Sequence, residues 1–144
     1  MLVTRTGDRV VIRFRYHATE AVSHPSIGFR VYTELGALIT STSTWLHGIE
    51  IPFIRPGDGY IDVDLACVNL VPARYNLSLW ISDGSHGSHV YDGLDHCVRL
   101  DVETSNFHGS GRDIDSGYGI VYFPQTWDLR GIETPRAVRE LSVD

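Results

Sequence analysis

Nearly every segment of this chain alternates between apolar and polar residues with a period of two. In the stretch DRVVIRFRYHA, Val10, Ile12, Phe14 and Tyr16 share one face, and the arginines share the other. The stretch at residues 73–83, ARYNLSLWISD, alternates in the same way. Because side chains alternate across a strand, this period indicates β-strands with one face in a core. No segment before the C-terminal tail has a helical period of useful length.

Strand-like segments recur along the chain, separated by turn residues at intervals typical of β-sandwiches. We expect strands at 8–18, in a hairpin over 23–44 that turns near 34–36, and at 48–54, 60–68, 73–84, 96–103 and 118–127. This pattern predicts an all-β fold, an immunoglobulin-like antiparallel β-sandwich of about seven to eight strands. We expect residues 1–144 to form one domain, with a short helix or tail after residue 131, where Thr134 would be the N-cap and Pro135 the first helical residue.

Charge and composition exclude several classes of partner. The 144 residues carry a net charge of −6, and all 12 basic residues are arginine. This balance argues against nucleic acid or an anionic membrane as the partner, because both favour a basic stripe. We find no apolar run long enough to span a bilayer and no signal peptide. Two cysteines, Cys67 and Cys97, are too few for a disulfide scaffold and are interpreted as small buried residues, so we expect a reduced, cytoplasmic setting.

Trp80 is the residue that most suggests a binding site. It lies in the middle of a predicted strand, on the face that otherwise carries Asn76, Ser78 and Ser82. One interpretation is that a loop or a partner chain covers the indole, since large aromatic side chains are usually buried. The other is that the indole stacks on the apolar face of a sugar ring, while its polar neighbours bind hydroxyl groups. Both interpretations stay open at this point.

Other residues would share the face that carries Trp80. Strands near residues 30, 80, 100 and 120 can belong to one sheet of an immunoglobulin-like fold. The candidate ligand-binding residues on the outer face of that sheet are Trp80, Asn76, Ser78, Arg30, Tyr32, Arg99, Asp101 and Tyr122. The alternative is a solvated sheet with cross-strand Arg–Asp pairs. Clustering with Trp80 favours the binding site.

Several other aromatic residues are expected to be structural. Tyr75 follows a loop at the start of a strand, which is the position of a tyrosine corner in sandwich folds. Trp127 would close the last strand and pack in the core. Trp45 and His47 fall in a loop, where they would either rim a pocket or face solvent, and we favour the second.

The order of these segments resembles the C-terminal domain of the ATP-binding subunit of bacterial ABC exporters for O-antigen polysaccharides, the Wzt type. The resemblance is carried by GDRVVIRFRYHA, HPSIGFRVYTELGALITSTST, VNLVPARYNLSLWISD, DHCVRLDVETS and GYGIVYFPQTW, over residues 5–129. His24 and Ala73 depart from the asparagine and glycine usual in the family. The chain has no lysine and hence no phosphate-binding G-x-x-x-x-G-K-[ST] loop, so we expect an excised domain or a free-standing relative of the family.

The resemblance implies a sandwich that binds the repeat unit of a bacterial polysaccharide before export. It also implies a homodimer that works with the exporter's nucleotide-binding and membrane subunits. Open edges of a sandwich invite strand pairing, so a strand-swapped dimer is one arrangement. The location would then be cytoplasmic and peripheral at the inner membrane. The rival hypothesis is a protein-interaction β-sandwich that binds no glycan.

Neither a metal site nor an active site is predicted. His86, His89, His96 and Cys97 are close in sequence, but their spacing is that of a flexible loop and not of paired zinc ligands. Asp62 and Asp64 share a strand face and could mimic the two carboxylates of a glycoside hydrolase, but nothing isolates one of them as an acid. We therefore expect no enzyme activity, no metal and no cofactor, and keep a glycoside hydrolase as the third hypothesis.

Overall fold

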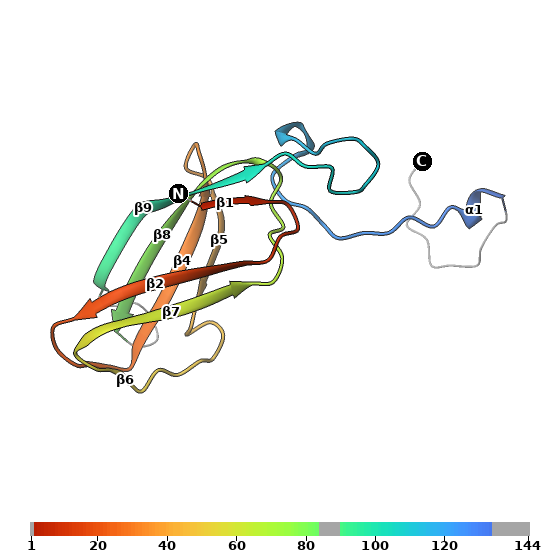
Figure 1. Ribbon diagram of the computed structural model, residues 1–144. Helices are drawn as coiled ribbons and strands as arrows, with labels where there is room; N and C mark the ends of the chain where they lie inside the picture. The colour runs from red at the N-terminus through yellow and green to blue at the C-terminus, as the bar shows by residue number, and fades with distance from the viewer. Residues whose placement is uncertain (1, 84–89, 134–144) are drawn as a thin grey trace.

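The computed structural model describes residues 2–83 and 90–133, and most of these residues lie in β-strands (Figure 1). The strands are β1 (Leu2–Arg5), β2 (Val10–Ala18), β3 (Val22–Ser23), β4 (Pro25–Thr33), β5 (Leu38–Ser43), β6 (Phe53–Ile54), β7 (Gly57–Leu65), β8 (Ala73–Asp83) and β9 (Val90–Glu103). Helical structure in the described ranges is limited to η1 (Ser116–Tyr118) and α1 (Arg130–Glu133). The predicted all-β class is confirmed.

Two sheets form the layers of a sandwich, as Figure 1 shows. The larger is a five-stranded sheet in the order β1-β9-β8-β4-β5, in which β1 is parallel to β9 and the other neighbours are antiparallel. The smaller pairs β2 with β7, and a short β3–β6 ladder lies at one end. Neighbours far apart in sequence, such as β2 and β7, are brought together by the hydrophobic faces that their alternation creates.

The core lies between the two sheets. Its buried residues come mainly from alternate positions of β4, β8 and β9, with Ile12 of β2 facing them: Ile12, Phe29, Val31, Val68, Tyr75, Leu77, Leu100 and Val102. Phe14 of β2 meets Phe29 of β4 edge to face, with ring centroids 6.2 Å apart. The face of β8 that carries Tyr75 and Leu77 is therefore the inner face, as its sequence predicts.

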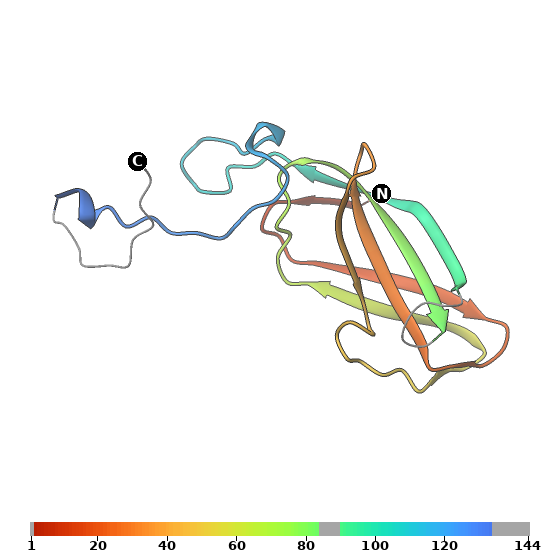
Figure 2. The same ribbon diagram turned by 180° about the vertical axis from the view of Figure 1, so that it is seen from behind.

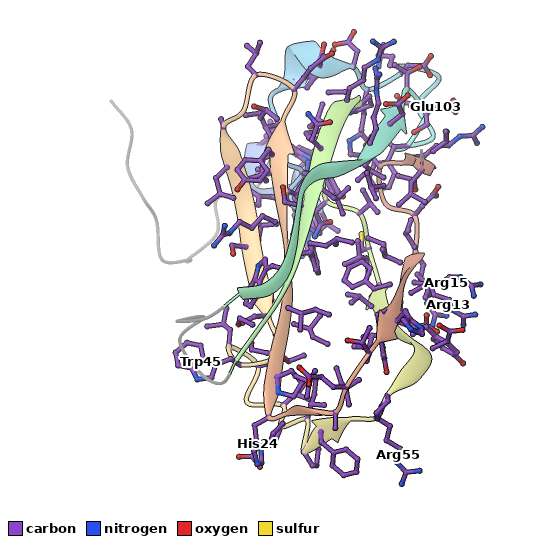
Figure 3. All side chains as sticks on the ribbon, turned by 90° about the vertical axis from the view of Figure 1, so that its left-hand side faces the viewer. Arg13, Arg15, His24, Trp45, Arg55 and Glu103 are labelled. Carbon is purple, nitrogen blue, oxygen red and sulfur yellow. The ribbon has the colours of Figure 1, made fainter. Side chains whose placement is uncertain are left out.

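Ion pairs cover the outer face of the β2–β7 sheet. Arg13 binds Asp62 through two nitrogens at 2.8 and 2.9 Å, and its guanidinium lies 4.0 Å from the centre of the Tyr60 ring. Arg9, the residue before β2, likewise binds Asp64 through two nitrogens. Figure 3 shows Arg13 pointing to solvent from β2. Exposed pairs of this kind contribute little to stability.

Tyr75 forms the predicted tyrosine corner. It is 2% exposed, and its hydroxyl donates to the carbonyl oxygen of Val71. The carbonyl oxygen of Ile120 lies 3.4 Å from the same hydroxyl. Burial raises the pKa of Tyr75, because the phenolate would be poorly solvated there. The ring thus ties the loop before β8 to the segment that follows β9.

Two predicted strands differ from the structure. The segment 48–54 pairs only at β6, because Pro52 cannot donate to a ladder. The segment 118–127 is not a strand, and its ladder pairing within the described residues is limited to one isolated bridge between Val121 and Leu70. The alternation of this segment is real, but in the described part of the chain no strand lies alongside it.

The C-terminal segment that leads to α1 extends away from the sandwich, as Figures 1 and 2 show. Trp127 is 82% exposed, so the expectation that it packs in the core is wrong. Cys67 is also exposed, because it follows the end of β7 instead of lying within the strand. The helix expected from Thr134 lies outside the described residues.

Candidate functional site

The outer face of the five-stranded sheet gathers every residue predicted to bind ligand except Tyr122. These residues come from three adjacent strands: Arg30 and Tyr32 from β4, Asn76, Ser78 and Trp80 from β8, and Arg99 and Asp101 from β9. They lie at the positions that alternate with core residues such as Phe29 and Leu77, so they point away from the core. We call this surface the outer sheet face.

Strand register places these side chains in rows across the sheet. Tyr32 pairs with Asn76, and Asn76 pairs with Arg99 on its other side. The next positions on β4 and β8, Arg30 and Ser78, also pair directly. Directly opposed residues in an antiparallel pair have Cβ atoms about 4.5–5.5 Å apart, so one small ligand can contact a whole row.

Trp80 lies flat against Gly28 of β4, its partner in the ladder. A Cβ atom added to Gly28 would lie 2.3 Å from Cζ2 of the indole and 2.6 Å from the carbonyl oxygen of Thr42. The absence of a side chain at Gly28 therefore creates the space that the ring fills. Trp80 is half-buried, so part of the indole is covered and part remains accessible at the surface.

Small polar residues surround Trp80 and are less exposed than the alternation predicts. Ser78 is only 3% exposed and Ser82 is 0% exposed. Both side chains therefore lie beneath the surface of the outer sheet face. Asn76 keeps intermediate exposure, and Arg74, two positions earlier on the same face of β8, is exposed.

The two arginines predicted on the outer sheet face each have a side-chain partner, but only one partner is charged. Arg99 binds Asp101, two positions further along β9, with Nε 3.0 Å from Oδ1. Arg30 is exposed, and its Nε lies 3.3 Å from the hydroxyl oxygen of Ser41 on β5. Arginine offers several N–H donors in a fixed plane, and a neutral ligand rich in hydroxyls can accept from them as well as an anion can.

Tyr122 lies elsewhere, and its placement on the outer sheet face is wrong. Its backbone N–H binds the carbonyl oxygen of Asn69, and its ring packs edge to face on Phe107 with centroids 4.8 Å apart. It lines a separate cavity of about 580 Å³ that is formed with residues of the loop after β9. The prediction failed because it assumed that the segment around residue 120 joins the sheet.

A cavity of about 610 Å³ lies between the two sheets, towards β3 and β6. Most of the side chains that line it are apolar, and they include Phe14, Tyr16, Ile27, Ile54, Ile61, Leu79 and Ile81. Tyr16 lies over Gly59 of β7, where a Cβ atom would meet its hydroxyl oxygen at 2.3 Å. Four polar or charged residues, Arg15, His17, Thr19 and Glu20, also line it, and the cavity extends to Gly28 and Trp80.

The two carboxylates considered for glycoside hydrolysis are both engaged in ion pairs. Hydrogen bonding and charge from Arg13 lower the pKa of Asp62, and Arg9 does the same for Asp64. Both groups are thus ionised at neutral pH. A glycosidase acid instead needs a raised pKa, so this pair lacks the asymmetry that the chemistry requires.

Within residues 2–83 and 90–133, no three His, Cys, Asp or Glu side chains converge on a point that could hold a metal ion. His86 and His89, and the side chains of His96 and Cys97, lie outside what the structure describes. None of the described helices is long and apolar enough to cross a bilayer.

Sequence reasoning missed the contribution of Gly28. A glycine inside a strand pattern marks a close approach of another group, and the stretch SIGFRV places one between two inward-facing residues. The hairpin pattern predicts that the strand carrying Gly28 pairs with the strand that follows it. The pairing of Gly28 with Trp80, on its other side, depends on the order of strands in the sheet. Only the structure shows that β8 lies next to β4.

Comparison with known proteins finds a matching protein family and a similar solved structure. The family model for the Wzt C-terminal domain matches residues 3–112. A solved structure described as the C-terminal domain of wzt superposes with a TM-score of 0.68 at 17% identity, and the match covers 88% of this chain and 72% of that one. The search of curated proteins gave no match. The predicted sandwich fold and the family resemblance are thereby confirmed.

Proposed function

The chain belongs to the family of Wzt C-terminal domains, and on that premise we propose that it binds a bacterial surface polysaccharide. The ligand would be an O-antigen-like repeat unit, recognised for export by an ABC transporter and not cleaved. The observation that carries this proposal is the outer sheet face, where half-buried Trp80 shares one surface with Asn76, Arg30 and Arg99. An apolar ring beside a few placed hydrogen-bonding groups is the usual composition of a small-ligand site.

Binding without catalysis is part of the proposal. The carboxylates Asp62 and Asp64 lie on the other sheet and are paired with arginines, which supports a non-catalytic role. A glycoside hydrolase would release new reducing ends from the polysaccharide during incubation. We expect none.

The partners would be the exporter's nucleotide-binding and membrane subunits, so the domain would act in the cytoplasm at the inner membrane. Family membership supports this placement. An outer sheet face that holds a polysaccharide would present it to the exporter, and no cofactor would be needed.

We further propose that the protein forms a homodimer by exchange of the C-terminal segment. Four large apolar residues of that segment are exposed: Phe123 at 80%, Trp127 at 82%, Leu129 at 63% and Ile132 at 79%. The β2–β7 sheet has only two strands, so each has an edge without a hydrogen-bonded neighbour. Exposed edges and exposed apolar segments both favour association, and strand exchange is a low-cost route to it.

If the C-terminal segment is exchanged, a charge placed in it should disrupt the dimer. Trp127→Asp places a carboxylate where an apolar contact is needed, and we expect the mass in solution to fall from two chains to one. Light scattering coupled to size-exclusion chromatography measures this. Leu35→Asp is the matched control, because Leu35 is 99% exposed in the β4–β5 turn and should leave the dimer intact. A wild-type protein that is monomeric at high concentration contradicts the proposal.

The function is tested by calorimetric titration with polysaccharide. The probe is the O-polysaccharide released by mild acid from the source bacterium's lipopolysaccharide, with dextran as the control polymer. We expect saturable binding of the first and none of the second. The competing hypothesis, a protein-interaction module, predicts no heat with either polymer and no change in tryptophan fluorescence.

A further inference from the structure

A small cavity lies at the end of the outer sheet face, where β4 begins. It has a volume of about 240 Å³ and is lined by His24, Pro25, Ser26, Thr44, Trp45, Ile49, Glu50 and Ile51. Its walls are the start of β4 and the segment that follows β5. Figure 3 labels Trp45 and His24 at the same end of the molecule. The volume falls below the roughly 300–1,000 Å³ of sites that enclose a drug-sized ligand, so it fits one small ring.

Unsatisfied polar groups mark this end of the sheet. Ser26 lines the cavity and is 4% exposed, and its hydroxyl has no hydrogen-bond partner among the described residues. Ser82, which is directly opposite on β8, is 0% exposed and is equally unpartnered there, as is Nε1 of the adjacent Trp80. Nearly all buried polar groups in proteins are hydrogen-bonded, so each exception calls for an explanation. A ligand hydroxyl in the cavity would supply a partner for Ser26.

The walls of the cavity are held in place by the backbone. Thr44 binds Ile27 twice: its N–H donates to the carbonyl oxygen at 2.9 Å, and its hydroxyl accepts from the N–H at 3.1 Å. His24 has φ of 49°, a left-handed conformation that is uncommon for a non-glycine residue. Its N–H donates to the carbonyl oxygen of Pro52 at 3.0 Å. Residues held in this way often belong to binding sites, because the surrounding structure must maintain them.

The lining resembles a sugar site in its chemistry. Trp45 and Ile49, which are 50% and 57% exposed, supply an apolar wall, and Ser26, His24 and Glu50 supply hydrogen-bonding groups. The carboxylate of Glu50 accepts hydrogen bonds from hydroxyls and repels other carboxylates. The cavity is therefore matched to a neutral ring and not to an acidic one.

We propose that this cavity binds one neutral sugar ring, as a second position for the polysaccharide beyond Trp80. The inference rests on the proposed function and extends it. Ser26, Gly28, Arg30 and Tyr32 are alternate residues on the same face of β4, so the positions from Ser26 to Tyr32 span about 20 Å. A chain of sugars lying along β4 would cross Trp80 and place a further ring in the cavity.

Serine-to-alanine variants separate binding from stability. Ser26→Ala removes a buried hydroxyl that has no partner in the free protein, so we expect the melting temperature to stay unchanged or rise. The same change removes a hydrogen bond to the sugar, so we expect the Kd for the polysaccharide to rise about three- to ten-fold. Ser23→Ala, at an exposed serine outside the cavity lining, is the matched control and should change neither quantity. A Ser26→Ala protein that is less stable and binds normally overturns the inference.

Nuclear magnetic resonance on the full chain locates the ring directly. The probes are the methyl pyranosides of glucose, mannose, galactose and N-acetylglucosamine, with glucuronic acid as the acidic comparison. We expect a neutral pyranoside to shift the amide signal of Ser26 and the indole signal of Trp45, and glucuronic acid to shift neither.

The outcomes distinguish the two proposals. If sugars shift the signals of Gly28 and Asn76 but not those of Ser26 and Trp45, the second position is wrong and the proposed function stands. If no pyranoside shifts any signal on the outer sheet face or in the cavity, both are rejected. If glucuronic acid shifts Ser26 as strongly as a neutral sugar does, the assignment to a neutral ring is wrong.

Discussion

Replacing Gly28 with alanine is expected to lower both the stability of the domain and its affinity for polysaccharide. The new methyl group would lie 2.3 Å from Cζ2 of Trp80 and 2.6 Å from the backbone oxygen of Thr42. The indole can move, but the backbone oxygen yields only if β5 shifts. Overpacking of this kind costs about 1–3 kcal/mol of unfolding free energy. Because the displaced indole no longer presents its ring to a sugar, binding should weaken by at least about ten-fold.

Thermal denaturation and calorimetric titration measure these two effects. Gly131→Ala is the matched control, since a Cβ atom there meets nothing within 4 Å. In a Trp80→Ala background the added methyl loses its clash with the indole, so the cost of Gly28→Ala should shrink. A Gly28→Ala protein with wild-type stability and affinity would show that the contact between Gly28 and Trp80 has no part in binding.

Replacing Trp80 with alanine should give the larger loss of affinity with the smaller disturbance of the backbone. Stacking of a flat ring on an aromatic side chain contributes about 1–3 kcal/mol, by analogy with nucleic-acid bases, and this corresponds to a rise of about five- to 150-fold in Kd. Trp80→Phe keeps part of the ring and should fall between alanine and the wild type.

A matched aromatic control exists on the other sheet. Tyr60 is 56% exposed on the outer face of β7, and Tyr60→Ala removes a ring there without touching β4, β8 or β9. We expect its Kd to equal that of the wild type. If Trp80→Ala folds and binds polysaccharide as tightly as Tyr60→Ala does, Trp80 is not part of the site.

Binding through a single outer sheet face should be weak, because each hydroxyl of a sugar exchanges a hydrogen bond with water for one with protein. A dimer offers two such faces to one repeating polymer. The second contact then benefits from the effective concentration that the first creates. The Trp127→Asp variant should therefore bind long polysaccharide more weakly than the wild type, while binding a single repeat unit equally well.

Much of the fold follows from alternation in the sequence. The inward positions of β2 and β8 are predictable because a half-buried strand must separate apolar from polar residues on its two faces. The tyrosine corner at Tyr75 is predictable as well, because the loop that precedes it is short and ends at a strand. Local patterns of this kind do not depend on which strands become neighbours.

The C-terminal segment shows where alternation stops being informative. Residues 118–127 carry the pattern of a strand, and yet Trp127 is 82% exposed and the segment's strand pairing within the described residues is limited to one isolated bridge at Val121. A period of two shows that a segment has two chemically different faces. It does not specify the chain against which the apolar face packs, and here the proposed exchange would place that face on a second copy.

The sequence predicts which residues share the face of the candidate site, but not which of them are buried. Arg30, Asn76 and Trp80 were expected on one face, and the strand order brings them together. The burial of Ser78 and Ser82 was not expected, because polarity predicts exposure and these hydroxyls lie beneath larger neighbours. The cavity beside Ser26 depends on how the segment after β5 folds back, and no local pattern encodes this.

The central claim is that polysaccharide lies on the outer sheet face, and chemical-shift mapping tests it most directly. The O-polysaccharide of the source bacterium is titrated into the labelled protein while backbone amide signals are followed. The account predicts shifts at Gly28, Asn76 and Arg99 on β4, β8 and β9, with no change at Arg13 and Tyr60 on β2 and β7. Shifts confined to β2 and β7, or to Ile27, Leu79 and Ile81, which line the cavity between the sheets from the core side of β4 and β8, would contradict it.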